Sequence, residues 1–215
     1  MTQEQIETRA ASWGRRSFVA LAVLLGSGAA GCASGRATFN SQTNLAGTAP
    51  IQRLLVVEDD GATGLTADMR TGLQTALANG FWACGVASTM LAAGAVDLNP
   101  RARIGSAAKD LATAAVLKIE PAEGSLYGKY ERQLHFALKV VDLESRQVTW
   151  LANAEFDVEL GGQFTNEVRS GERLGTSIVS RLRDDGVLPG CPSLVAGWPL
   201  IPHPEPQIVE PTRLR

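Results

Sequence analysis

The stretch Arg132–Glu159, "RQLHFALKVVDLESRQVTWLANAEFDVE", decides the fold of this chain. Large apolar side chains recur at every second position on both sides of the polar segment "DLESRQ". A period of two residues is typical of a β-strand that buries one face, and the polar segment predicts a turn. The sequence therefore predicts an antiparallel hairpin with one buried face. The residues expected on that face are Leu134, Phe136, Leu138, Val140, Val148, Trp150, Ala152, Ala154, Phe156 and Val158.

Two segments with helical spacing flank this hairpin. The first runs from Leu65 to about Leu77, with Thr66 as the expected N-cap and Gly80 as the expected stop. The second runs from about residue 170 to residue 185, and glycine and proline follow it. Their apolar residues fall on one helical face in each case. These residues are Leu65, Met69, Leu73, Ala76 and Leu77 in the first helix, and Leu174, Ile178, Val179 and Leu182 in the second.

The segments between them complete the predicted architecture. Apolar runs predict strands at Ile51–Glu58 and Ala114–Glu120, and a further short strand at Phe81–Ala87. A short helix is expected around Ser106–Ala112. This order predicts an α+β fold: a mixed β-sheet of four to five strands, with the hairpin prominent and the two main helices on one face.

The first segment of the chain has the pattern of an export signal. A basic pair at Arg15 and Arg16 precedes a short apolar run, and small residues then lead to Cys32. This order is typical of a secretory signal, and the apolar run is shorter than the roughly 20 residues that span a bilayer. We expect a signal peptide over residues 1–31 and a flexible tether over 32–50, because the latter is small, polar and aperiodic.

The segment Ala29–Cys32, "AAGC", resembles the lipobox of bacterial lipoproteins, although Ala29 stands where Leu is usual. The resemblance implies cleavage before Cys32 and its acylation with palmitate-like chains, which would anchor the chain to a membrane. An ordinary cleavage site is the alternative. Residue Ala33 is not the Asp that retains lipoproteins at the inner membrane, so the outer membrane, facing the periplasm, is expected. The arginine pair leaves the general secretory and twin-arginine routes both open.

The other end of the chain is rich in proline. Six of the ten prolines lie in residues 192–215, a spacing that excludes a helix or a central strand there. We expect an extended tail, for which three interpretations stay open: it docks a partner, it is disordered, or it lies across its own domain. A single α+β domain is thus expected over residues 51–191.

Cys84 and Cys191 each follow one of the two main helices. If these helices pack side by side and parallel, the two residues come within reach of a disulfide, which an oxidising compartment would favour. Two free thiols are the alternative.

Composition limits the remaining chemistry. The formal net charge of −2 gives no reason to expect a nucleic-acid partner. The two histidines, His135 and His203, are too few and too far apart for a metal site or a histidine-based triad. Phosphate-binding glycine loops and a serine nucleophile elbow are absent from the sequence, so no cofactor is expected.

The whole pattern resembles a group of small envelope lipoproteins. This group shares the β/α domain of the penicillin-binding-protein activators, the curli-secretion lipoprotein and the amino-terminal domain of the Tol-system β-propeller protein. The resemblance covers residues 51–186 and lies in "QRLLVVEDD", "LATAAVLKIEP", "FALKVVDLESRQVTWLANAEF" and "RLGTSIVSRL". It implies a non-enzymatic scaffold or regulator that binds a protein partner, and it carries no active-site residues across. The candidate contact residues are Tyr127, Tyr130, Phe164 and Trp198; the alternative for the tyrosines is that they cap the sheet edge.

Three rival functions remain at this point. A small periplasmic enzyme would need converging carboxylates, for which Glu58, Asp59, Asp60 and Asp97 are the candidates. A lipid-transport accessory would need an apolar pocket. The third is a phosphorelay receiver-like domain, suggested by the acidic residues at the end of "LLVVEDD", but export would separate it from cytoplasmic kinases.

Overall fold

A computed structural model describes residues 36–46, 48–59, 64–93, 99–123, 125–127, 131–159 and 167–192. All described residues belong to a single compact unit of the chain. The elements are β1 (Arg36–Thr43), β2 (Arg53–Asp59), α1 (Ala67–Ala83), β3 (Ala87–Ala93), α2 (Pro100–Asp110), β4 (Ala115–Pro121), β5 (Leu126–Tyr127), β6 (Glu131–Asp142), β7 (Val148–Glu159) and α3 (Glu167–Asp184).

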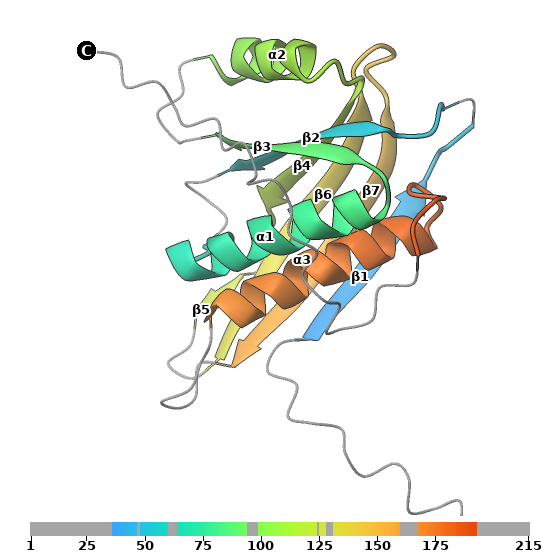
Figure 1. Cartoon of the computed structure of the whole chain (residues 1–215). Helices are drawn as coiled ribbons and strands as arrows, with labels where there is room; N and C mark the ends of the chain where they lie inside the picture. The colour runs from blue at the N-terminus through green and yellow to red at the C-terminus, as the bar shows by residue number, and fades with distance from the viewer. Residues whose placement is uncertain are drawn as a thin grey trace, which may run out of the picture. The chain divides into compact units, whose positions relative to one another are not determined.

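A mixed sheet forms the centre of this unit (Figure 1). Its strand order is β1-β7-β6-β4-β2-β3, and the short β5 pairs with β6 outside this path. Strand β2 is parallel to both of its neighbours, β3 and β4, whereas the other pairs are antiparallel. The α+β class is confirmed, and the sheet is larger than the four to five strands expected.

The hairpin of β6 and β7 is confirmed, with Leu134 opposite Phe156 and Val140 opposite Trp150. Its predicted inner face is buried, with one exception. Val148 is 45% exposed, because the register shifts between Val140 and Val141 and turns the first residue of β7 away from the core.

Strand β1 corrects the expectation of a flexible tether. All eight of its residues pair with β7, from Arg36 opposite Asp157 to Thr43 opposite Trp150. Ala37 and Phe39 are partly buried and pack against the core. An edge strand pairs with only one neighbour and needs few apolar residues. Because the sequence of β1 is mostly polar, a search for alternating apolar residues does not detect it.

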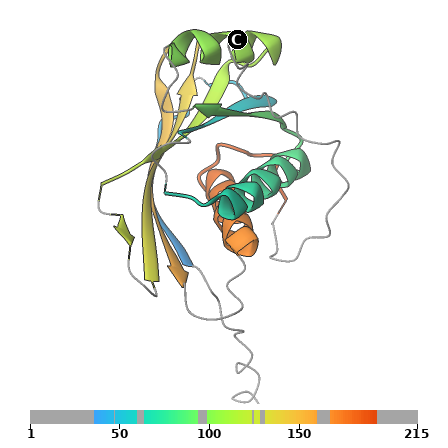
Figure 2. The same cartoon turned by 90° about the vertical axis from the view of Figure 1, so that its left-hand side faces the viewer.

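Helices α1 and α3 lie side by side on one face of the sheet, as predicted (Figure 2). Helix α1 continues through Gly80 to Ala83, so Phe81 belongs to a helix and the next strand starts only at Ala87. The residue that ends α1 is Gly85, at a φ of +72°, which only glycine adopts readily. Gly80 instead fits against Val179 of α3, where a Cβ would lie 2.8 Å from the Val179 Cγ2 atom.

Helix α2 covers the opposite face of β2, β3 and β4. It begins at Pro100, earlier than expected, because the Asn99 side chain accepts a hydrogen bond from the Ala102 N–H at 3.2 Å. Buried side chains from alternate positions of β2 pack beneath it in a second, smaller cluster. That cluster contains Leu55, Val57, Leu91, Ala108 and Val116.

The disulfide between Cys84 and Cys191 is confirmed. It joins the carboxyl ends of α1 and α3, and at their amino ends the Thr66 hydroxyl donates to the Glu167 carboxylate at 2.6 Å. The two helices are therefore parallel and linked at both ends. No helix among the described residues is long and apolar enough to cross a membrane.

Candidate functional site

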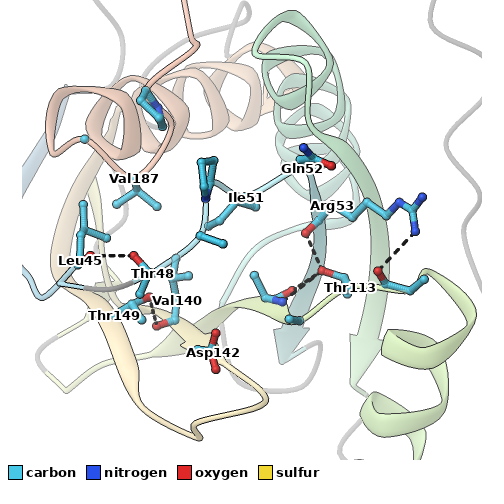
Figure 3. A pocket seen from close by; sticks show the side chains of 17 residues that line it. Leu45, Thr48, Ile51, Gln52, Arg53, Thr113, Val140, Asp142, Thr149 and Val187 are labelled. Atoms are coloured by element: carbon cyan, nitrogen blue, oxygen red, sulfur yellow. Dashed lines mark hydrogen bonds between the residues drawn. The ribbon is translucent and has the colours of Figure 1, made fainter.

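A cavity of about 600 Å³ opens at the sheet edge where β2 and β4 begin and the β6–β7 turn lies (Figure 3). Its other walls are the β1–β2 connection, at residues 45 and 48–52, and the turn that follows α3. This volume lies in the range of roughly 300–1,000 Å³ that is typical of ligand sites.

The turn after α3 has a fixed shape. Gly186, at a φ of +78°, ends the helix, and its N–H donates to the Arg183 carbonyl at 2.9 Å. The Val187 N–H donates to the Leu182 carbonyl at 2.9 Å. This pair of bonds is the Schellman arrangement, in which glycine is the favoured residue. It sets Val187 on the cavity wall, and the Cys84–Cys191 disulfide fixes the chain four residues later.

Four apolar side chains provide much of the lining. Leu45 and Ile51 come from the β1–β2 connection, Val140 from β6 and Val187 from the turn after α3. Val140 and Val187 are buried, and Leu45 and Ile51 are half-buried against the main core. The cavity therefore contains a water-excluding surface beside its polar groups.

Three threonine hydroxyls line the same cavity, and each donates to a main-chain carbonyl. Thr48 donates to the Leu45 carbonyl at 2.9 Å, and Thr149 donates to the Val140 carbonyl at 3.3 Å. On the opposite side, Thr113 donates to the Arg53 carbonyl. A carbonyl oxygen can only accept, so each hydroxyl hydrogen is already in use.

The cavity has one carboxylate, Asp142 at the end of β6. Its Oδ1 atom accepts from the Ser145 N–H at 2.7 Å and from the Ser145 hydroxyl at 2.9 Å. These hydrogen bonds from the Ser145 main chain and side chain lower the pKa of Asp142 below its ordinary value of 3.8. Asp142 is therefore an anion at neutral pH.

The cavity's one guanidinium, on Arg53, points away from the side of the cavity that holds Thr48 and Thr149. Its NH1 atom lies 3.4 Å from the carbonyl oxygens of Leu111 and Ala112, just beyond α2. In Figure 3 this side chain extends away from the wall that holds Thr48 and Thr149.

The contact residues proposed from sequence do not meet at this cavity. Tyr127 lies in β5, paired with Arg132 through the main chain. Tyr130, Phe164, Trp198 and the lipidation candidate Cys32 lie outside the described residues. Their roles stay predictions.

Two of the four carboxylates proposed for an enzyme, Glu58 and Asp59, lie within the described residues. Glu58 is buried at the end of β2, and its Oε1 atom accepts from the Arg70 Nε–H at 2.8 Å. Asp59 is half-buried, and Asp60 and Asp97 lie outside the described residues. Within the described ranges, no three His, Cys, Asp or Glu side chains group as metal ligands do.

Sequence reasoning missed the cavity residues because they flank elements instead of forming a motif. Thr113, Asp142 and Thr149 stand at the ends of β4, β6 and β7, and only the strand order brings them to one edge. The available signal was a hydroxyl or carboxyl group next to each strand end. It becomes useful once the sheet order is known.

No protein-family model matches this chain, and no curated protein matches it either. Solved structures similar to it include the PelC dodecamer from Paraburkholderia phytofirmans, at 17% sequence identity and a TM-score of 0.46, covering 71% of this chain and 98% of that chain. A single-substitution variant of the same dodecamer gives 16% identity and a TM-score of 0.45, covering 70% of this chain and 97% of the other. At this level of similarity, neither structure identifies a site in this chain.

Proposed function

We propose that this protein is an exported lipoprotein, anchored through Cys32 to the outer membrane, that acts as a non-enzymatic scaffold or regulator by binding a protein partner in the envelope. The export signal and the lipobox-like "AAGC" support its location. The resemblance to envelope lipoproteins over residues 51–186 supports the role.

The observation that carries this proposal is the disulfide between Cys84 and Cys191. Disulfides form and persist outside the cytosol and are rare within it. This one joins two residues outside the signal segment of the sequence, and it therefore supports export independently of the signal pattern. The disulfide also fixes the turn after α3, which forms one wall of the cavity. The bond that is typical of an oxidising compartment therefore also shapes the proposed binding surface.

The cavity itself favours a binding role over lipid transport. Its lining mixes apolar side chains with Asp142, Arg53 and three threonines, whereas an acyl chain prefers a wholly apolar pocket.

Location is tested by incorporation of labelled palmitate in cells. The wild-type chain should take up the label and sediment with the outer membrane, whereas Cys32→Ala should take up none. Ala33→Asp is the matched control, because it should keep the label and move to the inner-membrane fraction. Equal labelling of wild type and Cys32→Ala would refute lipidation.

Partner binding is tested by photo-cross-linking in intact cells. A photoreactive residue replaces Gln52, which is exposed and lines the cavity, and Lys109, on the exposed face of α2, is the control position. We expect one discrete protein adduct from position 52 and none of the same size from position 109. Absence of any protein adduct at position 52 would count against the scaffold role.

A further inference from the structure

We propose that the cavity at the β6–β7 turn binds a lysine or arginine side chain of the partner, with the cationic head at Asp142 and the threonine wall and the alkyl stem against the apolar lining. The identity of the partner as a protein rests on the function proposed above. The cation preference rests on the cavity alone.

The hydrogen-bonding capacity of the wall is the first argument. Thr48 and Thr149 lie together on one side of the cavity (Figure 3). Because both hydroxyl hydrogens are donated to main-chain carbonyls, what these side chains can still offer a ligand is oxygen lone pairs. A ligand that meets them must therefore bring hydrogen-bond donors.

The charge of the wall is the second argument. The Oδ1 atom of Asp142 accepts from the Ser145 N–H and hydroxyl, and the Glu144 N–H also contacts this carboxylate, so none of these donors carries a charge. A carboxylate that is paired only with uncharged donors favours a cationic ligand, because charge-assisted hydrogen bonds are the stronger ones. The guanidinium of Arg53 stays at the carbonyls of Leu111 and Ala112, so it does not neutralise Asp142.

The apolar lining is the third argument. Leu45, Ile51 and Val187 offer hydrocarbon surface beside the acceptors. A small hydrated metal ion gains nothing from such a surface, whereas lysine and arginine carry alkyl stems that pack on apolar side chains while their heads stay polar. At about 600 Å³ the cavity has room for residues next to the cation as well.

The test uses the full chain with Cys32→Ala, purified without acyl chains, and three probes of equal length: n-butylammonium, n-butanol and n-butyrate. Binding is followed by NMR of the backbone amides of Thr48, Thr149 and Val187. We expect shifts at these amides with n-butylammonium, at least about tenfold weaker binding of n-butanol, as the loss of one charge-assisted hydrogen bond implies, and no binding of n-butyrate.

Substitutions test whether Asp142 supplies the negative charge that binds n-butylammonium. Asp142→Asn should weaken n-butylammonium binding by about tenfold or more. Asp157→Asn is the matched control, because Asp157 is exposed on β7, accepts one hydrogen bond from Gln133 at 3.0 Å and does not line the cavity. Its binding should be unchanged. Since Asp142 also shapes the turn, Thr48→Val provides a second test that removes an acceptor without touching the turn, and it should weaken binding several-fold.

Equal binding of n-butanol and n-butylammonium, or unchanged binding in both Asp142→Asn and Thr48→Val, would overturn the inference. These outcomes are distinct from failure of the proposed function, which is read from palmitate labelling and from the cross-link at position 52. If the cation binds and no protein adduct forms, the cavity takes a cation but the scaffold role is lost.

Discussion

Gly171 of α3 lies directly against the main-chain carbonyl oxygen of Met69 in α1, and a Cβ atom at Gly171 would overlap that oxygen. The relationship is reciprocal, because a Cβ at Gly72 would overlap the Val168 carbonyl oxygen. Two glycines thus allow the backbones of the two helices to touch where they pack. The helix pair is closed at one end by the Thr66–Glu167 hydrogen bond and at the other by the disulfide.

Gly171→Ala should therefore destabilise the fold by at least about 2 kcal/mol, because an overlap with backbone can be relieved only by moving a helix. Urea denaturation followed by circular dichroism measures this. Gly105→Ala is the matched control, since a Cβ there meets nothing within 4 Å in α2. It should stabilise the protein by about 0.5–1 kcal/mol, as expected for a helical glycine replaced by alanine. Similar effects of the two changes would contradict the close packing of the helices.

The disulfide should contribute about 4 kcal/mol, since it closes a loop with a sequence separation of 107 residues. The double variant Cys84→Ser/Cys191→Ser should lose this amount in urea denaturation. A reductant should lower the melting temperature of the wild type and leave that of the double variant unchanged. Cys32→Ala is the control and should respond to the reductant as the wild type does. A wild type that is insensitive to reductant would show that the bond does not form in the protein.

The parts of the fold that follow from local periodicity could be predicted from sequence. Trp150 and Phe156 mark β7 because alternate burial repeats along the whole strand, and Leu174 and Ile178 mark α3 in the same way. The disulfide could be predicted because both cysteines follow helices that pack in parallel.

The parts that depend on tertiary partners could not be predicted in this way. Strand β1 has one large apolar residue, Phe39, and its pairing depends on β7, more than a hundred residues away. The end of α1 was predicted too early because glycine commonly ends a helix. Gly80 instead continues α1 and packs against Val179 of α3. The cavity combines Thr48 from the β1–β2 connection, Asp142 from the end of β6 and Val187 from the turn after α3, and no local sequence pattern predicts that proximity.

Strand β1 makes a prediction of its own. Alternate amides between Arg36 and Thr43 should be protected from hydrogen exchange, because an antiparallel edge strand directs every second N–H to its neighbour. The measurement is native-state exchange by NMR, with the exposed residues Ala49 and Gln52 of the following connection as the unprotected comparison. Uniformly fast exchange across the strand would restore the flexible-tether interpretation.

Asp185 links β7, α3 and β1. Its Oδ2 atom accepts from the Trp150 indole N–H at 2.7 Å and from Arg181 Nε–H at 3.0 Å, and Arg181 also donates to the Ser41 hydroxyl at 2.6 Å. Burial by itself raises the pKa of Asp185, but hydrogen bonds from Ser41 and Trp150 and the charge of Arg181 prevail, so the pKa lies below 3.8. Folding therefore favours the ionised carboxylate.

Asp185→Asn should consequently lower the free energy of unfolding at pH 7, by about 1–2 kcal/mol for a weakened buried acceptor. Because the folded pKa is depressed, this difference should be fully present above the unfolded value of about 3.9 and should vanish as the pH falls through the folded pKa. Urea denaturation of both proteins between pH 7 and pH 2 measures it. Asp184→Asn is the control, since Asp184 is exposed and its pair with Arg183 should contribute less than about 0.5 kcal/mol. A difference that grows in acid would contradict the assigned contacts.

Thr66 uses one hydroxyl to hold the amino ends of both main helices. The oxygen accepts from the Met69 N–H at 3.2 Å, and the hydrogen is donated to Glu167 at 2.6 Å. Thr66→Ser keeps both bonds and should change stability by less than about 0.5 kcal/mol, whereas Thr66→Ala loses the cap and should cost about 1–2 kcal/mol. The double variant Thr66→Ala/Glu167→Ala separates the two bonds, because alanine at position 167 has no acceptor for the Thr66 hydroxyl. If both bonds stabilise the fold, the double variant should lose less free energy of unfolding in urea denaturation than the sum of the losses in the two single variants. The reason is that each single variant already loses the Thr66–Glu167 bond. Strict additivity would show that Thr66 only caps α1 and that the disulfide alone links the helix ends.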